Sequence, residues 1–378
     1  MSYWDTFARL HMLKIQIKYI FFIPAVLMLA FAQGQNAPKY SNEFLSIGVG
    51  ARALGMANSV VASGDDVTSG YWNPAALTQI EHKAQGSLMH AAYFAGMANY
   101  DYGAVAIPIE KGVLGVSLIR FGVDDIMNTV DLIDPSTGQP NYNRITKFSA
   151  ADYAALISFA RELPVEGLSM GGNLKVIYRQ IGNFAEAWGF GVDAAIHYKR
   201  NGWMLGGVLR DGTSTFNAWS FSLDDRTQEV FLETGNELPE NDLELTLPRF
   251  IFGAAKKIYL NNERFSILPE VNVETTFDGR RNVLFASETV SWNPHMGIEA
   301  GFLDFIFLRG GVGNIQREPA FTGTHDTYIF QPNFGVGLYF KDVFGVGNIA
   351  IDYALTDVGS TSGLLYSNIF SLKFDFTK

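Results

Sequence analysis

Apolar and polar side chains alternate along most of this chain with a period of two residues. Between residues 188 and 198 the larger or more apolar positions are Trp188, Phe190, Val192, Ala194, Ile196 and Tyr198. The positions between them are Gly189, Gly191, Asp193, Ala195 and His197. Successive side chains of a β-strand point to opposite faces, so one face of this stretch suits hydrocarbon and the other suits a wet lumen. The pattern predicts a transmembrane β-sheet.

About fourteen stretches of this kind follow one another along the chain. Strands are expected over residues 86–95, 99–109, 112–122, 149–161, 167–180, 185–199, 202–211, 247–258, 265–277, 293–303, 305–314, 332–341, 346–357 and 365–377. A soluble β-sandwich would need polar outward faces, and strands that carry Trp188, Phe370 and Phe374 do not offer them. The fold class expected is an all-β membrane protein, an antiparallel transmembrane β-barrel of about fourteen strands.

The connections between these strands support a barrel because they alternate in length. Glu110-Lys111 and Arg200-Asn201 are tight turns, whereas residues 123–148 and 212–246 form long connections. Short turns at the inner side and long loops at the outer side are typical of outer-membrane barrels. The sequence therefore predicts that the chain lies in the outer membrane of a Gram-negative cell.

The N-terminal residues 1–32 are expected to be a signal peptide. Arg9, Lys14 and Lys18 are basic, residues 19–31 are apolar, and small residues precede Gln33. Residues 33–85 form the next unit and lack clean alternation, and Asn73-Pro74 reads as a helix start within it. A barrel of about fourteen strands has a wide lumen, so we expect residues 33–85 to be a plug inside it and residues 86–378 to be the barrel.

Composition agrees with this class of protein and excludes several others. Charged residues make up 17% of the 378 residues, below the roughly 25% of a soluble domain. The net charge of −10 argues against nucleic acid as a partner. Cysteine is absent, which removes disulfides, thiolate metal sites and cysteine nucleophiles together.

Motifs that carry chemistry are weak. The segment Gly167-Leu168-Ser169-Met170-Gly171 has nucleophile-elbow spacing, but the residues after it continue a strand where that motif needs a helix. No two of the six histidines stand three or four residues apart, so a zinc site is not expected. Glu270 and Glu274 lie about 13 Å apart on one strand, too far for a glycosidase pair. No catalytic, cofactor-binding or metal-ligating residues are expected.

Asp65 and Asp66 are adjacent carboxylates within the expected plug. Calcium binding is one reading, although the segment lacks the oxygen-rich loop that calcium sites use. The alternative is that they cap a helix or pair with Arg52 inside the barrel. An arginine–carboxylate pair in a confined lumen would fix the plug in place.

The segment from residue 50 to residue 77 resembles the N-terminal signature of the PorV/PorQ family. It contains Gly50-Ala51-Arg52-Ala53-Leu54-Gly55-Met56 and Tyr71-Trp72-Asn73-Pro74-Ala75-Ala76-Leu77, with Asp65-Asp66 between them. That family comprises outer-membrane proteins of the type IX secretion system of Bacteroidetes, and it is related to the FadL-type transporters. The likeness covers about 30 residues and is closest to PorV-like members.

The resemblance implies a 14-stranded FadL-like barrel that acts without catalysis. PorV-like members bind secreted cargo at its C-terminal signal domain and carry it from the translocon to a sortase-like attachment complex. The implied partners are outer-membrane lipid, translocon and sortase-complex proteins, and secreted cargo. The positions that match the signature, assigned to the architecture of the plug, are Gly50, Arg52, Gly55, Asp65, Asp66, Trp72, Asn73 and Pro74.

Two observations leave the function open at this point. Long connections carry aromatic residues that contact either partners or the barrel's own rim, namely Phe216, Trp219, Phe221 and Phe231. The alternative function is a FadL-like channel for hydrophobic small molecules, which requires an apolar internal pocket and a lateral opening at a kinked strand. Pro269 lies within a predicted strand and is the candidate for such a break, because proline cannot donate to the ladder. A proline at a bulge without any opening is the equal alternative.

Overall fold

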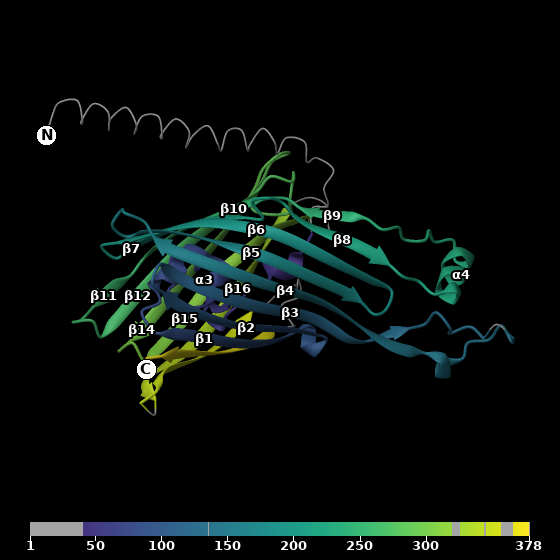
Figure 1. Cartoon of the computed structure of the whole chain (residues 1–378), viewed down its shortest axis with the longest axis horizontal. Helices are drawn as coiled ribbons and strands as arrows, with labels where there is room; N and C mark the ends of the chain where they lie inside the picture. Colours follow the sequence, from purple (N-terminus) through teal and green to yellow (C-terminus); the bar gives the residue numbers. More distant parts are fainter. Residues whose placement is uncertain (1–40, 135, 320–325, 344, 357–365, 378) are drawn as a thin grey trace.

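The computed structural model describes residues 41–134, 136–319, 326–343, 345–356 and 366–377. The predicted signal peptide, residues 1–32, lies outside the described residues. The described chain is an antiparallel β-barrel with short helical segments inside it (Figure 1). It is closed because β1 (Ala84–Tyr93) pairs on one side with β2 (Ala98–Ile109) and on the other with β18 (Ser367–Phe376).

The wall has fourteen strand positions in the part of the chain that the structure describes. Twelve positions are single strands, which include β1, β2 and β18. The other nine are β3 (Gly112–Asn128), β4 (Thr146–Glu162), β5 (Leu168–Ile181), β6 (Ala185–Arg200), β12 (Phe265–Thr276), β14 (Ser291–Phe302), β15 (Ile306–Pro319), β16 (Asp326–Val343) and β17 (Gly347–Thr356). One position is divided into β7 (Trp203–Arg210) and β8 (Thr215–Phe221). The next is divided into β9 (Leu243–Thr246), β10 (Arg249–Lys256) and β11 (Ile258–Leu260). The predicted number of strands is confirmed.

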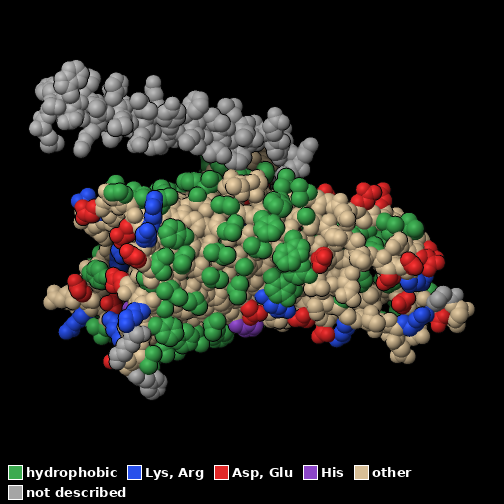
Figure 2. Space-filling view, viewed as in Figure 1, with side chains coloured by type: hydrophobic (Ala, Val, Ile, Leu, Met, Phe, Trp, Pro, Cys, Tyr) green, Lys and Arg blue, Asp and Glu red, His purple; other side chains and the backbone are tan. Residues whose placement is uncertain are grey.

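The two faces of the wall follow the period-two pattern. On β6, the side chains of Trp188 and Ile196 are 50% and 56% exposed, whereas those of Asp193 and His197 are buried toward the lumen. Figure 2 shows hydrophobic side chains over much of the middle of the molecule. Charged side chains gather near its two ends and in a smaller group, with a histidine, along the lower edge of the middle. This distribution is the one expected of a wall that contacts hydrocarbon on its outer face.

One expectation about strand limits is wrong, and the candidate break at Pro269 is not found. Residues 212–246 are not one loop, because β8 continues the wall along β6 and pairs with β9. The loop proper is residues 222–242, and it carries α4 (Asp225–Glu233), capped by the side chain of Asp224. Pro269 does not open the wall, since β12 pairs with β14 without a break at Pro269↔Ile298. The larger interruption is at residues 211–214, between β7 and β8.

Residues 41–80 lie inside the barrel and are called the plug below. The plug holds η2 (Glu43–Ser46), α2 (Ala51–Gly55), α3 (Ser69–Trp72) and η3 (Pro74–Gln79). Its apolar side chains pack on inward-facing side chains of the wall in one buried cluster, which includes Val49, Leu54, Tyr71 and Leu77. The lumen is therefore filled by chain over much of its length.

The barrel has two unlike ends. The turn end carries the short connections, such as residues 110–111 and 201–202, and the loop end carries α4 and the hairpin that extends from β3 and β4 (Figure 1). β13 (Phe285–Ala286) lies in a loop-end connection and pairs with β14. Among the described residues no helix is long and apolar enough to cross a membrane.

Candidate functional site

The plug is anchored by its own local structure first. Asn73 accepts a hydrogen bond from the backbone N–H of Ala75 (3.1 Å), and Pro74 occupies the first position of η3. This confirms the predicted helix start at Asn73-Pro74. The Nδ2 group of Asn73 donates to the carbonyl of Val61 (2.8 Å) and more weakly to that of Ile196 on β6 (3.2 Å). One side chain thus caps the plug helix and ties it to the wall.

Glu270 on β12 is a buried acceptor that the wall offers to the plug. Its side chain is 1% exposed, and its two oxygens accept the backbone N–H groups of Ala62 (2.7 Å) and Ser63 (3.0 Å). His197 on β6 completes the clamp, since its Nε2 lies 2.7 Å from the carbonyl oxygen of Ala62. A carboxylate that holds two N–H groups fixes both position and orientation of a backbone segment.

Arg52 joins the plug to β14, β15 and β17 through an ion-pair network. Its guanidinium contacts both oxygens of Glu299 at 3.0 and 3.3 Å and Asp65 at 2.8 Å. Glu299 also accepts from Arg309 (2.7 Å), which in turn pairs with Asp352 (2.6 Å). Burial disfavours the charged form of Arg52, but Glu299 and Asp65 outweigh burial and hold the pKa of Arg52 well above its usual value. The expected pairing of Arg52 with a carboxylate is present.

Asp65 and Asp66 have different partners. Asp66 accepts the backbone N–H of Thr68 (2.9 Å), and its carboxylate lies 3.6 Å from the ammonium of Lys373 on β18. Burial opposes the ionisation of Asp66, yet Lys373, Arg52 and the bonds from Thr68 keep its pKa below the ordinary value. In the described residues no group of three or more acidic or histidine side chains is placed to hold a metal ion. The calcium reading therefore finds no support in the geometry.

The remaining signature residues pack the plug. Trp72 donates from Nε1 to the carbonyl of Val49 (2.9 Å), and its ring edge lies over Gly48. Gly50 has a φ of 85°, which favours glycine, and precedes α2. Gly55 ends α2 against the backbone of Gly335 on β16, where an added Cβ would lie 3.0 Å from the Cα of Gly335. These contacts place all eight signature positions within or against the plug.

Two cavities lie on opposite sides of the plug. The loop-end vestibule, about 560 Å³, is bounded by the plug residues Leu54, Asn58 and Trp72 and by residues 281–283 of a loop-end connection. The turn-end vestibule, about 540 Å³, is bounded by Arg52, Asp65 and Gln79 and by Asp304 of a turn.

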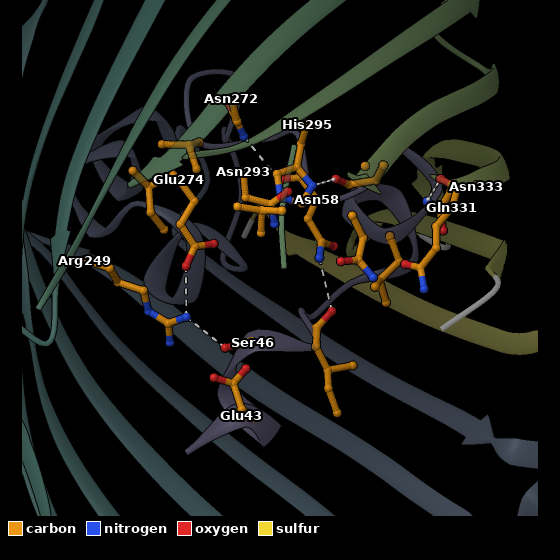
Figure 3. Close-up of a pocket in the computed structure, with 18 of the residues that line it drawn as sticks. Glu43, Ser46, Asn58, Arg249, Asn272, Glu274, Asn293, His295, Gln331 and Asn333 are labelled. Atoms are coloured by element: carbon orange, nitrogen blue, oxygen red, sulfur yellow. Dashed lines mark hydrogen bonds and ion pairs between the residues drawn. The ribbon is translucent and has the colours of Figure 1, made fainter. Parts of the chain in front are cut away.

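The loop-end vestibule has a polar lining that combines two kinds of side chain (Figure 3). On one side Arg249 pairs with Glu274 (3.0 Å) and donates to Ser46 (2.9 Å). On the other side amide side chains from the plug and from β12, β14, β15, β16 and a loop face the cavity: Asn58, Asn272, Asn282, Asn293, Asn314, Gln316, Gln331 and Asn333. Carboxamides both donate and accept, so this lining suits a ligand that does the same.

The segment around Ser169 and the two glutamates of β12 have structural roles in the lumen. Ser169 is buried on β5 and donates to the carbonyl of Ala75 in the plug (2.9 Å). Gly171, two residues on, has its Cα against the backbone of Pro74 and Ala75. The nucleophile-elbow spacing is thus a plug contact on a strand. Glu274 is a lumen charge, as expected, whereas Glu270 serves the plug.

Sequence reasoning missed the amide residues of the vestibule. Each stands at an inward-facing or loop-end position, and they are spread over several strands and loops, so no short motif connects them. The available signal was the recurrence of Asn and Gln near the loop ends of four successive wall positions, visible only after the strands are aligned as neighbours. Of the aromatic residues predicted to contact partners or the barrel's own rim, Trp219 contacts the barrel itself. It stacks on Phe221 and donates to Glu244 (2.8 Å).

The sequence matches no known family model, and no curated protein sequence matches it significantly. The fold, however, is similar to solved barrels. CymD, a monoaromatic hydrocarbon channel, has a TM-score of 0.51 and 11% identity over 88% of this chain and 98% of its own. A TodX deltaS2S3 mutant, also a monoaromatic hydrocarbon channel, has 0.50 and 10% over 88% and 99%. A FadL homologue of Pseudomonas aeruginosa has 0.48 and 13% over 87% and 98%.

The closed wall and the apolar outer band define a β-barrel membrane protein. Its fold is similar to that of CymD and of the TodX mutant, and the described chain has fourteen wall positions with residues 41–80 in the lumen. At 10–11% identity the likeness to CymD and TodX is one of fold.

Proposed function

We propose that this protein is an outer-membrane channel through which a small molecule passes, with the plug as its gate. The observation that carries the proposal is the pair of vestibules on opposite sides of the plug. Ligand sites in proteins commonly enclose about 300–1,000 Å³, and each vestibule is of that size. The FadL-like fold supports the proposal, because CymD and TodX are channels in the same architecture.

A catalytic role has little support. Ser169 and His197 both use their side chains on plug carbonyls. The chemistry that remains is binding and gating, in which the contacts between plug and wall set the closed state.

The gating proposal is tested with a reversible lock. The chain lacks cysteine, so Gly70→Cys with Ser158→Cys introduces the only two thiols. A Cβ at Gly70 would lie 3.8 Å from the Cβ of Ser158, close to the mean of about 3.8 Å in disulfides. In proteoliposomes we expect solute uptake to fall when the pair is oxidised and to return on reduction, measured with a panel of toluene, sugars and short peptides.

Each single-cysteine variant is the control, since it cannot form the crosslink and its uptake must not respond to oxidation. Uptake that is equal in the oxidised and reduced double variant would show that the plug is not the gate. Absence of uptake for every solute, in a protein that is correctly folded in the liposome, would remove the channel proposal itself.

A second candidate is a component of the type IX secretion system, as the PorV/PorQ-like signature implies. The specific observation in its favour is the loop end, where long segments extend beyond the barrel and expose apolar side chains: Ile133, Tyr142, Leu232 and Leu238. Exposed apolar residues on extended loops are typical of protein contacts. The proposed partners are secreted cargo and the translocon and sortase-complex proteins.

The two candidates differ in what a deletion strain loses. For a secretion component, cargo stays unsecreted or unattached at the cell surface, and translocon or sortase proteins co-purify from solubilised outer membranes. For a channel, cargo display is normal and uptake of the solute is lost. Normal display together with an empty pull-down would reject the secretion role.

A further inference from the structure

We propose that the loop-end vestibule binds a neutral saccharide. This inference rests on the proposed channel for its physiological setting, and it departs from the hydrocarbon named for CymD and TodX. It concerns the occupant of the cavity bounded by the plug, by β12 to β16 and by the loop at residues 281–283.

The first argument is the kind of polar group that lines the cavity. Eight of its 24 lining residues carry carboxamides. A carboxamide offers two N–H donors and a carbonyl acceptor, and a sugar hydroxyl offers one donor and two lone pairs. Each can therefore satisfy the other in either direction. A hydrocarbon would exclude water from the lining and would leave unpaired every polar atom that has no partner within the protein, which is unfavourable.

The second argument is that polar atoms of the lining stand without partners among the described residues. The Oδ1 of Asn293 and the Oγ1 of Thr356 are buried and make no hydrogen bond there. Both residues line the vestibule, from β14 and from the end of β17. Asn293 lies among the labelled side chains of the cavity in Figure 3. Buried polar atoms are usually paired, so unpaired ones beside a cavity point to a ligand that pairs them.

The third argument concerns charge. Arg249 is paired with Glu274 at 3.0 Å, and Arg210 donates to the carbonyl of Tyr71 at 2.8 Å. Arg281 pairs with Asp278 and lies 3.6 Å from Glu43. A charged ligand would have to displace one of these internal partners, whereas a neutral ligand leaves them intact.

The closed wall favours a saccharide over a peptide as the ligand of the vestibule. Peptides bind β proteins most readily by adding a strand to a free sheet edge. In this barrel β1 pairs with both of its neighbours, and the strands around the vestibule pair on both sides as well. The cavity therefore offers side chains rather than a backbone edge, which favours a compact polyhydroxylated ligand.

Equilibrium binding tests the inference without any need for transport. Full-length protein in detergent is titrated calorimetrically with maltose, glucose, toluene and trialanine. We expect a saccharide to bind, and Asn293→Leu and Thr356→Val each to weaken binding about fivefold, as expected for the loss of one neutral hydrogen bond. Asn293→Gln should retain most of the affinity, because it keeps the carboxamide.

The matched control is Asn368→Leu, the same substitution at an exposed position of the outer face. It must leave binding unchanged, and heat-dependent electrophoretic mobility establishes that every variant retains the folded barrel. The inference is overturned if toluene or trialanine binds more tightly than both sugars. It is also overturned if neither maltose nor glucose binds. Saccharide binding by a protein that transports nothing would overturn the channel and leave this inference standing.

Discussion

Individual wall residues hold the plug by forming hydrogen bonds with its backbone, and Glu270 is an example in which one side chain forms two such bonds. Its carboxylate accepts two consecutive N–H groups, those of Ala62 and Ser63, in a site closed to water. Only an acceptor with two oxygens fits, because any N–H in its place would face another N–H. The polar residues of the lumen thus include specific partners of the plug, and their spacing along a strand carries no catalytic meaning.

Glu270→Gln tests this point, since it replaces one acceptor oxygen by an NH₂ group. One plug N–H then faces a donor, and we expect a loss of roughly 1–3 kcal/mol in the closed state of the plug. Hydrogen exchange read by mass spectrometry should show residues 59–65 exchanging faster. Glu166→Gln, an exposed turn residue, is the control. Unchanged exchange in the Glu270→Gln variant would mean that the carboxylate does not hold the plug.

At the scale of elements, the strands were predictable because the alternation of apolar and polar side chains within each strand distinguishes its two faces. The alternation around Trp188 and Asp193 is local information, and β6 follows it from Ala185 to His197. The extension of the wall by β8 and β9 was missed, because their pairing partners are set by the register of β6 rather than by their own pattern. The cap at Asn73 was predictable, since it depends on adjacent residues alone.

The path of the plug and the vestibule could not be predicted in the same way. They depend on which inward-facing positions of distant strands lie together. Glycines at these positions let the backbone of the plug approach the backbone of the wall. Gly311 on β15 has the backbone of Met56 and Ala57 against it, so that an added Cβ would overlap the carbonyl carbon of Met56. An added Cβ at Gly206 on β7 would likewise overlap the carbonyl oxygen of Val61. Such contacts join residues that are far apart in the sequence, and no local pattern announces them.

Gly311→Val should therefore displace the plug while the wall remains intact. The neighbouring Gly310 provides the matched control, because an added Cβ there has its nearest contact at 4.0 Å. We expect Gly310→Val to behave as the parent protein. Gly311→Val should raise the accessibility of the plug to protease and raise basal solute leakage in liposomes. Equal protease resistance in the two variants would contradict the close packing of plug and β15.

At the scale of the whole molecule, the outer face defines how the barrel sits in a membrane. Apolar outward residues cover the middle of β1 to β4, and then a polar cluster follows toward the loop end. In this cluster His90 lies 2.7 Å from Asp101, and Arg120 lies 3.7 and 3.8 Å from Asp101 and Asp124. Charges that face lipid are costly at the centre of a bilayer and are tolerated near its surface. The cluster therefore marks the limit of the hydrocarbon band, and β3 continues beyond it into the aqueous loop region.

Spin labels on single cysteines measure this limit directly, because the chain has no cysteine of its own. Leu118 and Asp124 both lie on β3, about 20 Å apart at strand rise. A label at Leu118→Cys should be accessible to oxygen and protected from a water-soluble relaxation agent, as expected within hydrocarbon. A label at Asp124→Cys should show the reverse. Equal exposure of both sites to the water-soluble agent in liposomes would mean that this face does not contact lipid, and the transmembrane orientation of the barrel would be wrong.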